Sequence, residues 1–217
     1  LLFFGGSPDS KERSQSKQVK KHYNTTYNTS KKSSMRNVRK APAKAPSLRE
    51  IKLGNKRFNP KKEEADIYNY IRGKYRGVSE DDAREISKSL VKYGQKHNLD
   101  PKFVAAVIAR ESSFNKMAES PTGAQGLGQI KPFNFKSLNI TDPNNIQQNV
   151  SGTTQYLKRL LNRWKTKSEA SSLAVASYYE GPNSVQRSGG NYGSDTASYV
   201  KGIMKKYKEI KESKLSR

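Results

Sequence analysis

Apolar residues recur at three- and four-residue spacing over most of the chain after residue 59, and this spacing predicts a helical domain. Each predicted helix follows a capping residue, in several cases with proline at the first helical position. The predicted starts are Asn59, Ser79, Asp100, Asp142, Ser168 and Thr196. No run alternates with period two, and segment 121–139, rich in Gly, Gln, Pro and Phe, predicts a structured loop or a small irregular sheet. The fold class is therefore mainly α.

The N-terminal region lacks this pattern. Between Gly5 and Ser47 the chain contains no Leu, Ile, Phe or Trp, and it consists largely of Ser, Asn, Thr, Lys and Gln. Such a segment cannot bury enough apolar surface to offset its conformational entropy, so we expect it to be disordered when alone. We therefore predict a low-complexity arm over residues 1–62 and a helical domain over residues 63–217.

Charge is also divided unevenly between these two parts. The whole chain has 42 Lys and Arg against 19 Asp and Glu, a net charge of +23. Residues 1–62 carry 17 basic and 3 acidic residues, so more than half of the excess lies in the arm. A basic excess indicates an anionic partner, for which nucleic acid, a cell-wall polymer and an acidic protein surface all qualify. The arm is open to three interpretations: a solvated linker, a nucleic-acid-binding tail, or the docking segment that we favour.

Several kinds of chemistry are excluded by composition. The chain has no cysteine, which rules out disulfides, thiolate metal sites and cysteine nucleophiles. Two histidines are too few for a histidine-built metal centre, so we expect neither a metal nor a cofactor. No stretch approaches the ~20 apolar residues that a membrane-spanning helix needs.

Glu111 is the candidate catalytic residue. It continues the apolar stripe of the third predicted helix, falling four residues after Val107 and three after Ile108. It also lies near the C-terminus of that helix, where the helix dipole disfavours negative charge. Burial and the dipole would both raise the pKa of the carboxyl group, which suits a general acid near neutral pH. The alternative is a surface glutamate on a frayed last turn.

The segments that follow Glu111 are rich in glycine, amide, hydroxyl and aromatic side chains, a mixture typical of carbohydrate sites. They read E-S-S-F-N from Glu111, S-P-T-G-A-Q-G-L-G-Q-I from Ser120, Y-Y-E-G-P from Tyr178 and D-T-A-S-Y-V from Asp195. In this order, over about residues 85–210, the four segments resemble the lysozyme-like catalytic domain of soluble lytic transglycosylases.

The resemblance implies an enzyme that cuts peptidoglycan glycan strands without a cofactor. Glu111 matches the family's glutamate, which protonates the bond between N-acetylmuramic acid and N-acetylglucosamine and then takes the proton of the muramoyl C6 hydroxyl, closing a 1,6-anhydro ring. The substrate-binding positions that match the family are Ser120, Gln129, Tyr178 and Tyr199, and Tyr179, which adjoins Tyr178, is a further candidate. An ordinary glycosidase needs a second carboxylate across the bond. The next acidic candidates are Glu119, Asp142, Glu180 and Asp195, so a hydrolytic muramidase stays an alternative.

Four positions depart from the family pattern. Gly128 stands where the family usually has Met, Tyr179 replaces an Asn, Glu180 replaces an Ala and Asp195 replaces a Glu. The departures imply altered sugar subsites around an intact acid.

The leading hypothesis is a lytic transglycosylase whose arm, residues 1–62, docks it to a larger protein assembly. A bacteriophage tail or portal, with the enzyme carried in the virion and acting in the bacterial periplasm, fits best; a secretion apparatus and a periplasmic location are the alternative. A second hypothesis is an assembly protein that uses a lysozyme-like domain as a non-catalytic module. Nucleic-acid binding by the arm is the least favoured.

Overall fold

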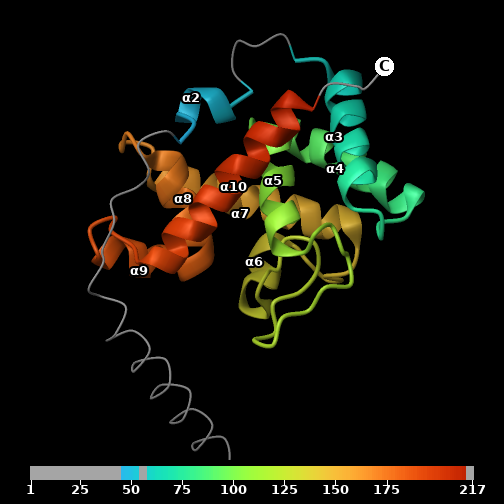
Figure 1. The fold of residues 1–217 in the computed structure, drawn as a ribbon. Coiled ribbons are helices and arrows are strands. Elements are labelled where there is room, and N and C mark those ends of the chain that lie inside the picture. Colours follow the sequence, from blue (N-terminus) through green and yellow to red (C-terminus); the bar gives the residue numbers. More distant parts are fainter. Residues whose placement is uncertain (1–44, 54–57, 214–217) are drawn as a thin grey trace, which may run out of the picture.

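The structure, a computed structural model, describes residues 45–53 and 58–213. In this part of the chain the regular elements are helices (Figure 1). They are α2 (Leu48–Ile51), α3 (Pro60–Lys74), α4 (Glu80–His97), α5 (Pro101–Glu111), the 3-10 turn η1 (Pro132–Asn134), α6 (Phe135–Leu138), α7 (Ile146–Arg163), α8 (Ala170–Glu180), α9 (Pro182–Arg187) and α10 (Ser194–Glu212). Within the described residues none of these helices is long and apolar enough to cross a membrane.

Helix α5 lies at the centre of the body. All its residues from Pro101 to Ala109 are buried, and all of them except Lys102 are apolar. The side chain of Asp100 caps it by accepting a hydrogen bond from the Lys102 backbone N–H, and Pro101 occupies the first helical position. Helices α3, α4, α7 and α10 pack around α5, and α8 packs on α7 and α10. The body therefore holds the end of α5 in a fixed place.

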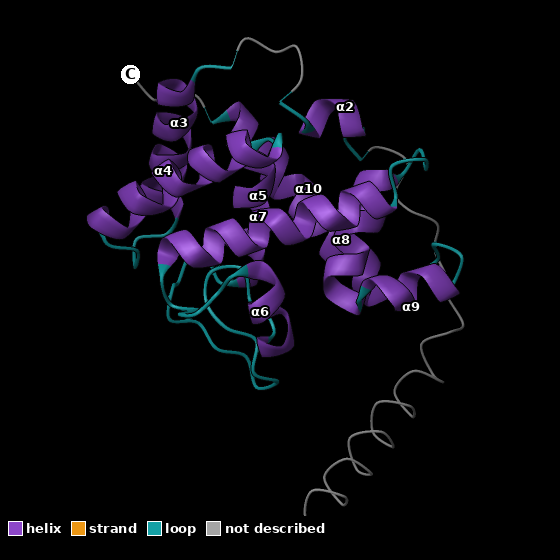
Figure 2. Ribbon diagram, turned by 180° about the vertical axis from the view of Figure 1, so that it is seen from behind, coloured by secondary structure: helices purple, strands orange, loops and turns teal. Residues whose placement is uncertain are grey.

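A lobe made mostly of loop separates α5 from α7, and it hangs below the helical body in both views (Figures 1 and 2). Within residues 118–131 the only pairing of strand type is two isolated bridges, Glu119 to Gln125 and Gln125 to Ile130. The structured-loop interpretation of segment 121–139 is thus confirmed, and α6 with η1 supplies its only helical turns.

The local caps at Asn59, Ser79 and Asp100 lie where the sequence predicts them. The predicted start at Asp142 is wrong by three residues. The Asp142 side chain instead accepts from the Asn144 backbone N–H, a local turn, and Asn145 becomes the cap of α7. Helix α8 begins at Ala170, two residues after the predicted Ser168, and α10 begins at Ser194, two before the predicted Thr196.

Helix α9 has no counterpart in the prediction. Gly181 adopts a φ of 87°, which breaks α8, and Pro182 then opens α9 at its first helical position.

Residues 45–53 pack on the helical body. Ser47 and Glu50 form a capping box that starts α2, and Ile51 of the same helix is fully buried in the core. The Ile51 carbonyl accepts a hydrogen bond of 2.8 Å from the Asp100 backbone N–H, at the cap of α5. The predicted boundary at residue 62 falls inside α3. Residues 1–44 of the predicted arm lie outside the described residues.

Candidate active site

Glu111 is the last residue of α5, and its side chain is half-buried. The hydroxyl of Tyr199, from α10, donates a hydrogen bond to the Glu111 Oε1 atom. Tyr199 is only 4% exposed, because α10 packs directly on α5. Residues 88 positions apart in the sequence are thus brought into contact by helix packing.

Burial raises the pKa of Glu111 to about 7, although the Tyr199 hydrogen bond and the positive charge of Arg110 both act in the opposite direction. Near neutral pH the carboxyl group therefore exists in both its protonated and its ionised form. A group with this pKa can give a proton and take one back at the same pH.

Tyr178, from α8, joins the helical body to the loop lobe. Its hydroxyl donates a hydrogen bond of 2.6 Å to the carbonyl of Gly128, and its ring packs on Tyr156 at a centroid distance of 5.2 Å. Burial, with a further contribution from the nearby negative charge of Glu111, raises the pKa of Tyr178 well above its usual value. Tyr178 therefore remains a hydrogen-bond donor at any physiological pH.

Ser120 and Gln129 organise the loop lobe itself. The Ser120 hydroxyl accepts a 2.9 Å hydrogen bond from the Ala124 backbone N–H. The Gln129 side-chain amide donates to the carbonyls of Ala118, at 2.9 Å, and Gly126, at 3.0 Å, while its backbone has a φ of 49°. Neither side chain hydrogen-bonds Glu111 in the described residues, so the structure groups these two with the loop and Tyr199 with the acid. Tyr178 is hydrogen-bonded to the loop but lies near enough to Glu111 for the charge of Glu111 to raise its pKa.

Gly128 is packed against α7 with no room for a side chain. A Cβ atom there would lie 1.9 Å from Thr153 Oγ1 and 3.0 Å from Thr153 Cβ. The Gly128 backbone N–H donates to the buried side chain of Asn149 at 2.8 Å. Thr153 thus occupies the space beside Gly128, and no sequence motif pointed to Thr153.

The other departures from the family pattern lie at the contact between α8 and α10. The Tyr179 ring stacks on Tyr199, with centroids 4.6 Å apart and an angle of 26° between the ring planes. Thr196 donates a hydrogen bond to Glu180 through its hydroxyl. Asp195, in the first turn of α10, is exposed.

The remaining acidic candidates lack the half-buried setting of Glu111. Glu119 and Asp142 are both exposed. Among the residues that the structure describes, no group of three His, Asp or Glu side chains could hold a metal ion.

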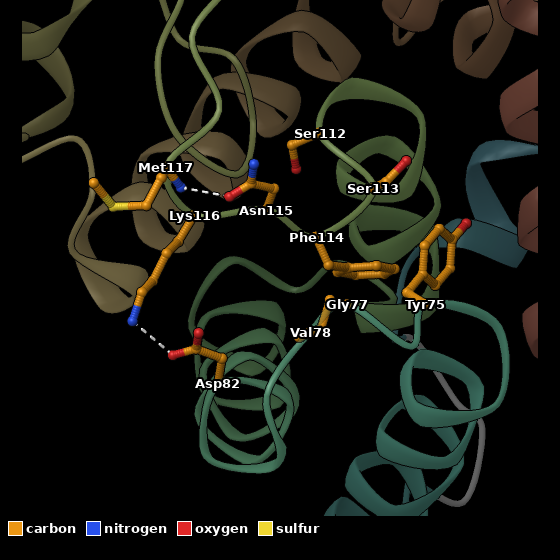
Figure 3. A pocket seen from close by; sticks show the side chains of 10 residues that line it. All are labelled: Tyr75, Gly77, Val78, Asp82, Ser112, Ser113, Phe114, Asn115, Lys116 and Met117. Carbon is orange, nitrogen blue, oxygen red and sulfur yellow. Dashed lines mark hydrogen bonds and ion pairs between the residues drawn. The ribbon is translucent and has the colours of Figure 1, made fainter.

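A depression of about 520 Å³ lies beside the segment that follows Glu111 (Figure 3). Phe114 turns inward there and packs edge-on against Tyr75, while the Lys116 ammonium forms a 2.7 Å ion pair with Asp82. The left-handed backbone of Ser113 and Phe114, with φ values of 52° and 62°, directs the Phe114 ring into the core. Phe114 and Lys116 thus connect the segment that follows Glu111 to Tyr75 and to α4.

Residues 88–201, just over half of the chain, match the model of the Transglycosylase SLT domain. The chain therefore belongs to this family.

Two relatives show how far the similarity extends. The Transglycosylase of Enterobacteria phage PRD1 is 36% identical over 109 residues, which are 50% of this chain and 38% of that protein. The membrane-bound lytic murein transglycosylase F of Desulfosudis oleivorans is 34% identical over 73 residues, 34% of this chain and 16% of that protein. The chain thus spans well under half the length of these relatives.

The X-ray structure of an inactive mutant of the lytic transglycosylase Slt from Pseudomonas aeruginosa has a similar fold. The TM-score is 0.52 at 19% sequence identity, over 71% of this chain and 30% of that one. The similarity confirms the mainly α, lysozyme-like fold class.

Proposed function

We propose that this chain is a peptidoglycan lytic transglycosylase in which Glu111 is the single catalytic acid and base. The observation that carries the proposal is the setting of Glu111: a half-buried carboxyl group, hydrogen-bonded to a neutral tyrosine, with a pKa of about 7. Membership of the Transglycosylase SLT domain family supports the same reaction class.

The proposed reaction needs one carboxyl group twice. Protonated Glu111 gives its proton to the oxygen that links N-acetylmuramic acid to N-acetylglucosamine, and the C1–O bond breaks with the electron pair leaving on that oxygen. The Glu111 carboxylate then takes the proton of the muramoyl C6 hydroxyl, whose oxygen bonds to C1 and closes the 1,6-anhydro ring. Glu111 ends protonated, and no water is consumed.

The other predicted site residues support this step from two sides. Tyr199 orients the carboxyl group through its hydrogen bond to Oε1. Tyr178 connects the end of α8 to the loop lobe, and Ser120 and Gln129 hold the loop in the shape that a sugar would contact. In the proposed complex these side chains line the position of the glycan strand.

Product analysis on purified sacculi tests the proposal. The wild-type protein should release muropeptides with anhydro ends, and Glu111→Gln should release almost none. Mass spectrometry separates the alternatives, because a muramidase leaves reducing ends in place of anhydro ends. If the wild-type protein releases nothing, the domain is a non-catalytic module.

We propose further that the enzyme acts on the bacterial cell wall as part of a phage particle, held there by its basic N-terminal region. A relative from phage PRD1 and the charge excess of residues 1–62 support this role. Removing residues 1–44 should leave the release of muropeptides unchanged and abolish co-purification with the particle. If that region instead binds DNA, its affinity will fall steeply as salt rises.

A further inference from the structure

Tyr179 is an exposed aromatic residue in an unusual setting. Its side chain is 54% exposed, yet the ring is stacked on the buried ring of Tyr199. Near-parallel aromatic rings at this separation attract each other and hold a defined relative orientation. Tyr179 therefore has one face against Tyr199 and a large part of its surface open to a ligand.

Its two neighbours in the sequence fix the helix backbone on both sides of Tyr179. Tyr178 is hydrogen-bonded to the Gly128 carbonyl of the loop lobe, and Glu180 is hydrogen-bonded to Thr196 at the start of α10. Side chains of consecutive helical residues point in different directions, so the last turn of α8 contacts the loop and α10 at once. The backbone of Tyr179 is thus fixed between two tied positions.

The stacked ring connects directly to the acid. Tyr199 contacts Tyr179 through its ring and Glu111 through its hydroxyl, and the guanidinium carbon of Arg110 lies 5.7 Å from the centroid of the Tyr199 ring. Because Tyr199 contacts both residues, a displacement of the Tyr179 ring would also move the hydroxyl group that is hydrogen-bonded to Glu111.

Both contacts depend on residues that depart from the family pattern. An asparagine at position 179 has no ring to stack on Tyr199, and an alanine at position 180 has no oxygen to accept the Thr196 hydrogen bond. The two departures therefore act together, joining α8 to α10 beside Glu111 and adding an aromatic face there.

From this arrangement we infer that Tyr179 is a substrate-positioning residue: the outer face of its ring stacks on the pyranose ring of an N-acetylated sugar beside Glu111, while the inner face holds Tyr199 on the acid. The inference rests on the proposed function and specifies one subsite of it. A flat, uncharged aromatic face suits the C–H face of a sugar ring, since both surfaces are apolar and neither carries a charge.

Sugar binding tests the inference without requiring catalysis. In a Glu111→Gln background, the affinity for a tetramer of N-acetylglucosamine is measured by titration calorimetry. Tyr179→Asn should weaken binding by about tenfold, and Tyr179→Phe, which keeps the ring, should stay within about twofold of the parent. Met117→Asn removes another exposed apolar side chain, one that lines the depression of Figure 3, and serves as the matched control with unchanged affinity.

Kinetics on sacculi test the second half of the inference. Tyr179→Asn should raise KM and lower kcat together, because both the sugar contact and the support of Tyr199 are lost, and Tyr179→Phe should restore both. Thermal unfolding of each variant checks the fold. Tyr179→Leu, apolar but without a flat ring, replaces the Asn variant if the latter does not unfold cooperatively.

The inference is overturned if Tyr179→Asn binds the tetramer as tightly as its parent, or if Tyr179→Phe is as weak as Tyr179→Asn. A failure of the proposed function gives a different result, because the wild-type protein then releases no product from sacculi. The calorimetric titrations of the Tyr179 variants would still show whether the ring contributes to sugar binding.

Discussion

The carboxylates of Asp66 and Glu111 are both shielded from water at contacts between helices, but their neighbours differ in charge. Asp66, on α3, is 4% exposed and accepts hydrogen bonds of 2.6 Å from Lys102 and 2.7 Å from Lys62. Lys102 is itself buried and also lies 3.1 Å from Glu63. Glu111 instead receives its hydrogen bond from the neutral hydroxyl of Tyr199.

The pKa values move in opposite directions as a result. Burial acts to raise the pKa of Asp66, but the hydrogen bonds and charges of Lys102 and Lys62 outweigh it and lower the pKa below its usual value. At Glu111 burial outweighs the Tyr199 hydrogen bond and the positive charge of Arg110, and the pKa rises to about 7. A buried acid paired with cations stays ionised and ties helices together, whereas one paired with a neutral donor can exchange protons.

The largest expected effect comes from removing the exchangeable proton. Glu111→Gln should lower the rate of muropeptide release by about a thousandfold, because general acid and base catalysis is lost. The measurement is release from purified sacculi. Glu119→Gln, which changes an exposed acid in the loop lobe, is the control and should leave the rate unchanged. Comparable losses in both variants would contradict the role of Glu111.

The second-largest expected effect is a loss of folding stability when the buried ion pair is broken. Asp66→Asn should lower the free energy of unfolding by about 3 kcal/mol, because the buried Lys102 ammonium loses its nearest anion. Urea unfolding at neutral pH measures it. A double variant, Asp66→Leu with Lys102→Met, removes both charges and should recover much of the loss. A change below about 1 kcal/mol in the single variant would show that the ion pair contributes little.

The pH dependence of stability separates the two acids further. Because the folded-state pKa of Glu111 is raised, its proton stabilises the fold below the ordinary pKa and this contribution disappears as pH rises through about 7. Between about pH 5 and pH 8, wild type should therefore lose roughly 2 kcal/mol relative to Glu111→Gln.

Asp66 behaves in the reverse sense over the same titration. Its pKa is lowered, so its contribution is present above the ordinary range and is lost only as pH falls below it. The difference between wild type and Asp66→Asn should thus stay constant from about pH 5 to pH 8 in the same urea experiments. A slope in that difference, or none for Glu111→Gln, would break the comparison.

The smallest effect concerns the hydrogen bond on Glu111. Tyr199→Phe keeps the ring but removes a donor that lowers the pKa of Glu111, so the pKa should rise by about one unit. The fall in rate on the alkaline side of the pH profile should then move to higher pH. Tyr207→Phe removes a comparable hydroxyl, the one bonded to Asp100 at 2.7 Å, and should not move the profile. A downward move in Tyr199→Phe would contradict the assigned direction.

Local signals in the sequence predicted the helix caps well, because a cap depends on the few residues around it. Asn59, Ser79 and Asp100 all accept hydrogen bonds from the first turn that follows them. The signal failed where two caps competed: Asp142 and Asn145 are both suitable, and the local turn of Asp142 leaves Asn145 to start α7.

The surroundings of the acid were much harder to predict. Spacing placed Glu111 on the apolar stripe, but its partner Tyr199 lies on a different helix, and only the family resemblance associated the two. The buried position of Lys102 had no signal, since a lysine in the first turn of a helix usually reaches solvent. Pairings of this kind depend on how α3, α5 and α10 pack, which no short segment determines.

The close contact between Gly128 and Thr153 also restricts the order in which these positions can change during evolution. With Thr153 in place, the methionine usual in the family would place its Cβ against the threonine hydroxyl, so that replacement alone should be disfavoured. A lineage that moves from one pattern to the other must first accept a smaller residue at position 153. The two sites are therefore expected to show epistasis, with the fitness of each residue set by the other.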